Sequence, residues 1–180
     1  LISAVLAPER FEAYASALHS SSWLRPVEIG LAVIAVAHVG LTITKAITNR
    51  RAGNIAQLSS SRDAPLAALA SRSKGMAGLL TLTFLVVHLN QLRWPRPAAG
   101  QETAVLSSVL HHPLNAVLYA AAALMLALHL LHGTEAAHRS LGWLSPTNRS
   151  ALRIGGRLMA TLIGGGFLLI SLSLALGGAA

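Results

Sequence analysis

Four long stretches without a charged side chain alternate with segments that carry the charged residues of this chain. The charge-free stretches are residues 29–44, 75–92, 103–134 and 158–180. Each stretch, with the polar residues at its ends, offers the ~20 residues needed to cross the hydrocarbon core of a bilayer. A lone strand leaves its backbone groups unsatisfied in lipid, so each crossing must be helical. The pattern therefore predicts four membrane-spanning helices, at about 27–48, 74–93, 113–135 and 156–177.

Composition agrees with this pattern and narrows the chemistry. Of the 180 residues, 53% are hydrophobic and only 11% are charged, whereas a soluble domain carries about 25% charged residues. We therefore expect a single all-α domain, an integral membrane helical bundle. The chain has no cysteine, which excludes disulfides, cysteine-bound iron–sulfur clusters and thiolate-bound haem within it. Histidine remains as the obvious metal ligand.

The segment before the first span has a pattern of its own. Residues 9–26 predict a short amphipathic helix on the outer surface, with Phe11, Tyr14, Ala15 and Leu18 on one apolar face. Serines 20–22 and Pro26 predict the break before the span. Residues 1–6 (LISAVL) are apolar but too short to cross a bilayer, so we expect the tail of a helix whose body lies upstream.

Positive charge is distributed unevenly between the polar segments. The net charge is +8, and Lys and Arg number two before the first span, then six, two, four and none in the successive later segments. This alternation agrees with the positive-inside rule, which places basic loops on the cytoplasmic side. We expect loops 49–73 and 136–156 to be cytoplasmic and both chain ends to face outward. The same distribution argues against a nucleic-acid-binding surface.

Three histidines lie inside three different charge-free stretches: His38, His88 and His129. Titratable side chains within a membrane are costly and commonly functional, and neutral imidazole is a common axial ligand of haem iron. The predicted topology puts His38 and His129 at one level in the inner half of the membrane and His88 nearer the outer face. This predicts a bis-histidine haem between spans one and three. His88 needs a further histidine, which no remaining span supplies.

Other interpretations of these histidines stay open at this point. A histidine in a membrane helix is often a hydrogen-bonded residue between helices. His132 lies one turn after His129, where it either contacts a haem propionate or has a structural role.

With these residues placed, the chain resembles the cytochrome b558-type membrane anchor subunit of succinate dehydrogenase, a succinate:quinone oxidoreductase. The matching segments are FEAYASALHS from Phe11, the stretch from Glu28 to His38 with NRR after it, the Ser71-Arg72…Gly78…FLVVHL pattern, and HLLHG from His129. They cover most of residues 9–142 and occur in the order found in the family.

This resemblance implies five helices and usually two b haems, the first helix being missing or truncated in this chain. It implies that His38 and His129 bind the haem nearer the iron–sulfur subunit. His88 would bind the outer haem, with its partner on the helix upstream of Leu1. It also implies that Ser71 and Arg72 lie near quinone or haem propionates.

The resemblance further implies the function: a haem b-binding membrane anchor of respiratory complex II. Such a subunit passes electrons from an iron–sulfur subunit to quinone, most commonly menaquinone. Succinate is oxidised on a separate flavoprotein subunit that holds FAD. The location implied is the inner (plasma) membrane of a bacterium. Two alternatives remain: a cytochrome b subunit of a formate dehydrogenase or hydrogenase, and a haem-free membrane anchor or transporter whose histidines relay protons or pack helices.

Overall fold

The computed structural model describes residues 6–53 and 65–177, and all regular structure within these ranges is helical. The elements are α2 (Pro8–Ser20), α3 (Leu24–Arg51), α4 (Pro65–His88), the π-helical turn η1 (Leu89–Arg93), α5 (Glu102–His111), α6 (Pro113–Ser140), α7 (Arg149–Ala160), the π-helical turn η2 (Thr161–Gly165) and α8 (Gly166–Ala175). The predicted all-α class is confirmed. Of the predicted tail, residues 1–5 lie outside the described residues.

Four of the helical stretches are long and apolar enough to cross a membrane: Leu24–Arg51, Pro65–Arg93, Pro113–Ser140 and Arg149–Ala175. The number of spans is therefore the predicted one, and the protein is a multi-pass membrane protein in contact with lipid. The helices extend beyond the predicted spans into the predicted loops 49–73 and 136–156. Helix continues from residue 49 to Arg51 and covers 65–73, and it also covers 136–140 and 149–156. Charged residues mark where lipid ends, but the backbone can stay helical beyond that point.

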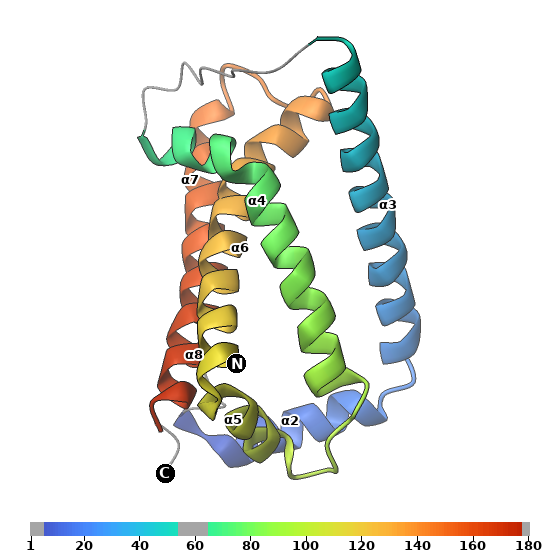
Figure 1. Cartoon of the computed structure of the whole chain (residues 1–180), viewed down its shortest axis with the longest axis vertical. Helices are drawn as coiled ribbons and strands as arrows, with labels where there is room; N and C mark the ends of the chain where they lie inside the picture. The colour runs from blue at the N-terminus through green and yellow to red at the C-terminus, as the bar shows by residue number, and fades with distance from the viewer. Residues whose placement is uncertain (1–5, 54–64, 178–180) are drawn as a thin grey trace. The chain divides into compact units, whose positions relative to one another are not determined.

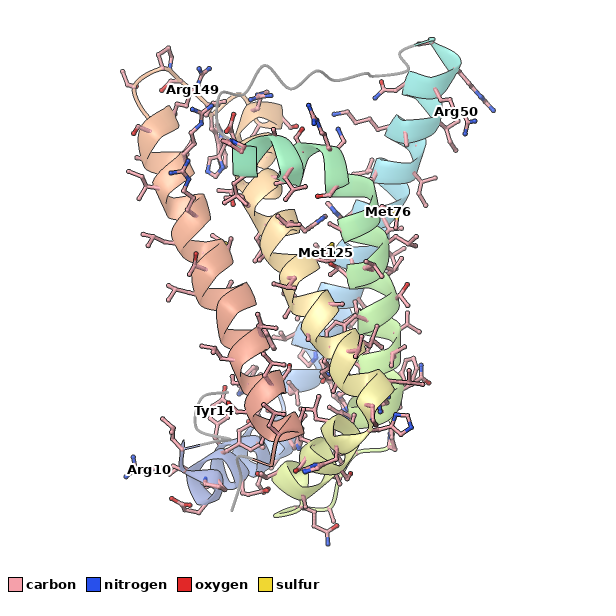
Figure 2. The ribbon with its side chains drawn as sticks, turned by 60° about the vertical axis from the view of Figure 1, so that its left-hand side comes forward. Arg10, Tyr14, Arg50, Met76, Met125 and Arg149 are labelled. Atoms are coloured by element: carbon pink, nitrogen blue, oxygen red, sulfur yellow. The ribbon has the colours of Figure 1, made fainter. Side chains whose placement is uncertain are left out.

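Helix α4 bends near its start. Figure 1 shows its first turns running crosswise to the rest of the helix, and Figure 2 shows Met76 on the long arm after the bend. The Ser73 hydroxyl donates a hydrogen bond to the Leu69 carbonyl at 2.9 Å, and Gly75 lies two residues later. Both features favour helix bending. The span predicted to begin at residue 74 thus corresponds to the long arm.

Prolines and turns end the helices largely where the sequence predicts. Pro113 occupies the first turn of α6, where its missing N–H is not needed. The segment after η1 contains Pro95 and Pro97 and is not helical until α5. Pro26 differs from the prediction, because it lies inside the first turn of α3 and not in the break, which is confined to residues 21–23.

The described chain divides into two compact units. One unit is formed by residues 14–59 and contains α3; the other contains residues up to Ala13 and everything from residue 60 onward. We call the latter the α4–α8 unit and describe each unit separately. In the α4–α8 unit, α6 packs against α4 and against the rod formed by α7, η2 and α8, and α5 packs across one end against α6 and α8 (Figure 1).

Small residues allow the α7–η2–α8 rod to lie close to α6. Gly156, Ala160 and Gly164 are buried at a spacing of four residues, which keeps them on one helix face. A Cβ built at Gly164 would meet the Ala127 Cβ at 2.5 Å and the Ala123 carbonyl oxygen at 3.0 Å. Close backbone approach through small residues is the usual way for helices to associate in lipid.

Candidate functional site

Helices α4 and α6 run antiparallel, and two contacts between them show which residues lie at the same level. At one level, a Cβ built at Gly78 would lie 3.7 Å from Cε1 of His129. At another level, His88 Nδ1 lies 3.3 Å from the Tyr119 hydroxyl. Gly78 and His88 are ten residues apart on α4, as are Tyr119 and His129 on α6. The two histidines therefore face the same interface at levels about 15 Å apart along the helix axes, at ~1.5 Å per residue.

His88 is the first member of a polar chain that links α4, η1, α6 and α5. The Tyr119 hydroxyl donates to Gln91 Oε1 at 3.0 Å. The Gln91 amide nitrogen donates to Asn115 Oδ1 at 3.0 Å, and the Asn115 amide nitrogen donates to the Val109 carbonyl at 3.0 Å. These four links hold the His88 ring at a fixed position, because a buried polar group without a partner is costly in lipid.

The π-helical turn explains how Gln91 takes part in this chain. The Trp94 amide donates to the Leu89 carbonyl at 2.9 Å, which closes a ring one residue wider than that of an α-helix. Single π-helical turns of this kind often occur at functional sites. The wider turn lies directly after His88, and Gln91 within it contacts both Tyr119 and Asn115.

The other side of the His88 ring is aromatic and apolar. The Phe84 ring lies 5.4 Å from the His88 ring and packs edge-on against Tyr119 at 4.8 Å. Beyond Phe84, a cavity of about 30 Å³ lies between α4, α6 and α8, with Ser171 among its mostly apolar lining residues. The buried cluster of Leu110, Tyr119, Ile170 and Leu174 lies at the same end of the interface, so the surroundings of the polar chain are mostly apolar.

His129 has a different setting, since one side of its ring lies over the backbone of α4 at Gly78. Gly133 lies one turn later on the same helix face, and a Cβ built there would meet no atom within 4 Å. The space beside Gly133 is compatible with the close approach of a flat ligand. His132 is half-buried on α6, one turn from His129, as its sequence position requires.

His38 lies on α3 and therefore in the unit formed by residues 14–59. Thr42 donates from its hydroxyl to the His38 carbonyl at 2.8 Å, so both residues lie on one face of α3, as the sequence spacing indicates. Since His129 belongs to the α4–α8 unit, the pairing of His38 with His129 stays a prediction.

Ser71 and Arg72 lie in the first turns of helix α4, before its long arm. Ser71 is half-buried and Arg72 is exposed. They lie at the end of the α4–α8 unit where α4 begins. Arg149 lies at this end too, whereas Arg10 lies at the opposite end (Figure 2).

Two carboxylates that were not predicted as site residues, Glu135 and Glu12, have structural roles. Glu135 is buried on α6 and forms ion pairs with Arg139 at 2.6 Å and with Arg153 of α7 at 3.2 Å. Its spacing of four from Arg139 is the sequence signal that indicates the first of these pairs.

Glu12 binds the start of α5, a helix that the sequence analysis did not predict. Its carboxylate accepts the backbone N–H groups of Glu102 at 3.1 Å and Thr103 at 2.7 Å, which are unsatisfied donors of the first helical turn. Partial burial raises the pKa of the Glu12 carboxyl, but the hydrogen bonds from Glu102 and Thr103 outweigh it and lower the pKa from 4.5 to about 2.

Within the described residues, no group of three or more His, Asp or Glu side chains could hold a metal ion. A bis-histidine haem requires only two protein ligands to its iron, so this finding does not bear on haem. No family model matches the chain, and neither a curated protein nor a solved structure is significantly similar to it.

Proposed function

We propose that this chain is a haem b-binding membrane anchor subunit of succinate dehydrogenase, which passes electrons from an iron–sulfur subunit to menaquinone. Succinate itself is oxidised on the flavoprotein subunit that carries FAD. The single observation that supports this proposal best is the position of His88 and His129 on one helix interface at two separate levels.

The separation between these two histidines defines which ligand pairs are possible. Levels about 15 Å apart are too far for both rings to bind one iron, because two axial nitrogens of a haem lie only a few ångströms from each other. Each histidine therefore takes a different partner. The arrangement fits an anchor with two haems at two depths, in which His129 and His38 would hold the inner haem and His88 would be one ligand of the outer haem.

The surroundings of both rings fit such a cofactor. Gly78 leaves the His129 ring room against α4, and the space beside Gly133 accommodates a flat molecule. The His88 ring is held through Nδ1 by Tyr119, as the second ring nitrogen of metal-bound histidines usually is. Bound haem b supplies a one-electron redox centre, and the residues named here hold and orient it.

The basic end of the α4–α8 unit completes the proposal. Arg139 and Arg153 are about half exposed although they pair with Glu135. This end carries Ser71 and Arg72 as well, and it corresponds to the cytoplasmic side by the positive-inside rule. We assign it to docking of the iron–sulfur subunit, with Ser71, Arg72 and His132 near quinone or haem propionates.

An optical spectrum of the intact complex purified from membranes tests the haem assignment. We expect a b-type signal after reduction with dithionite. His129→Ala and His38→Ala should each remove the same haem, whereas His88→Ala should remove a different one. His111→Ala is the matched control, since this exposed histidine bonds only to Ser107 of its own helix among the described residues.

Two results would overturn the proposal. Absence of any reducible b-type signal would exclude the haem function and favour an anchor or transporter without cofactor. Co-purification with a formate dehydrogenase or hydrogenase in place of a flavoprotein that oxidises succinate would assign the chain to another respiratory complex.

A further inference from the structure

In the polar chain between Val109 and His88, each hydrogen bond has a defined donor and acceptor. The Val109 carbonyl determines this order. A carbonyl oxygen only accepts hydrogen bonds. The Asn115 group at 3.0 Å from it must therefore be the NH₂ group, which turns the Asn115 oxygen towards Gln91. One backbone atom of α5 thus fixes an amide orientation that diffraction data alone often leave open.

The orientation of Asn115 in turn fixes the orientations of Gln91 and Tyr119. Because Asn115 presents its oxygen, Gln91 donates its NH₂ group to it at 3.0 Å and presents Oε1 to Tyr119. The Tyr119 hydroxyl then uses its only proton to donate to Gln91 Oε1 at 3.0 Å. Its oxygen is left as an acceptor for His88 Nδ1 at 3.3 Å.

We propose that Gln91 and Asn115, acting through Tyr119, are positioning residues that hold His88 as the Nδ1–H tautomer and so present its Nε2 as the nitrogen with a free lone pair. Which ring nitrogen of a histidine binds a metal is set by the hydrogen bond that the other nitrogen makes. The consequence for iron binding rests on the proposed function, whereas the tautomer does not.

The tautomer is measured directly by solid-state NMR of the full chain in lipid, labelled with ¹⁵N-histidine, with His88 assigned by difference from His88→Gln. We expect a protonated Nδ1 and an unprotonated Nε2. Tyr119→Phe should lose this preference, because the hydroxyl that accepts from Nδ1 is absent. Gln91→Leu should lose it too, because the Tyr119 hydroxyl no longer donates to residue 91 and is free to donate to Nδ1. Gln91→Glu should keep it, since a carboxylate oxygen still accepts from Tyr119.

Phe84→Leu is the matched control. It removes ring contacts with both His88 and Tyr119 but none of the hydrogen bonds of the chain. If Gln91 acted only in packing, Gln91→Leu and Phe84→Leu would both lower thermal stability and both leave the tautomer unchanged. That result, or an Nε2–H tautomer of His88 in the unaltered chain, overturns the proposal.

The haem content of the same preparations separates this inference from the proposed function. If both hold, Tyr119→Phe should weaken binding of the haem that His88 ligates by roughly tenfold or more and raise its reduction potential, because Nε2 becomes a weaker donor. A correct tautomer in a chain that binds no haem would support the positioning role and reject the haem function.

Discussion

His129 lies directly against Gly78: a methyl group at Gly78 would come within 3.7 Å of Cε1 and 3.8 Å of Nδ1 of the imidazole ring. This distance is an ordinary van der Waals contact, so alanine fits at residue 78, and a larger side chain directed at His129 would have to displace the ring. The histidine proposed to bind the inner haem is thus positioned by the absence of a side chain on the neighbouring helix.

Gly78→Leu should displace the His129 ring and lower the content of the inner haem, while Gly78→Ala should leave it nearly unchanged. We expect Gly78→Leu to lower the free energy of unfolding by roughly 1–3 kcal/mol, as overpacking of a protein core does. Haem-to-protein ratio and thermal unfolding in detergent measure the two effects. Gly75→Leu serves as the control, since a Cβ there meets nothing within 4 Å. Equal haem loss in both Leu variants would contradict the role assigned to Gly78.

Gly164→Ala should be destabilising although alanine is the better helix former. Its Cβ would lie 2.5 Å from the Ala127 Cβ, so α6 and η2 must separate, at a cost of roughly 1–3 kcal/mol. Gly165→Ala has open space at the same helix turn and should be neutral or stabilising by up to about 1 kcal/mol. Thermal unfolding of the two variants side by side gives the comparison. The same loss in both would show that helix backbone effects, not the contact with α6, dominate.

The contact of Glu12 with the start of α5 should make stability depend on pH in the acid range. The folded-state pKa of about 2 lies below the value of 4.5 expected without these contacts. The unfolded state therefore binds more protons, and the stabilisation is fully present above pH 4.5 and is lost as pH falls towards 2. Melting temperatures measured between pH 6 and 2 should show a smaller decline for Glu12→Gln than for the unaltered chain. Glu9→Gln, on the exposed side of the same helix, should decline like the unaltered chain.

Arg153 should matter more than Arg139 for holding α7 against α6, although both pair with Glu135. The Arg139 pair lies within α6 and should be worth about 0.3–0.5 kcal/mol, whereas the Arg153 pair joins two helices and should be worth about 1 kcal/mol. Since both arginine side chains are about half exposed, added salt should reduce the difference between Arg153→Met and Arg139→Met. Unfolding at low and at high ionic strength tests this order. A larger loss for Arg139→Met would contradict it.

The charge-free stretches were sufficient to predict the four spans, because lipid excludes charged side chains. They did not predict helix ends, since helix continues into the region where charges are solvated, as at Pro65 and Ser140. Helix α5 was missed because its ten residues are too few to give a clear pattern and its first turn is stabilised by Glu12, a residue far away in the sequence. The bend of α4 was missed as well, although Ser73 and Gly75 are its local signals.

For the candidate site, the helical spacing of Asn115, Tyr119 and His129 along the sequence is enough to put the three residues on one face of α6. That face is the one that contacts α4. Gln91 was not predicted, because its role depends on a π-helical turn that no residue pattern announces. The contact between Gly78 and His129 was not predicted either. It depends on the antiparallel register of two helices, which the spacing within each helix does not determine.

The π-helical turn η1 also makes the site sensitive to the number of residues after His88. Removing Asn90 would restore the narrower α-helical turn and rotate the residues after it, Gln91 among them, by about 100°. Gln91 would then no longer face Tyr119, although every polar residue type would still be present. Related chains that differ by one residue here are therefore expected to lack this hydrogen-bonded chain, so segment length is a better guide than residue identity to which of them share it.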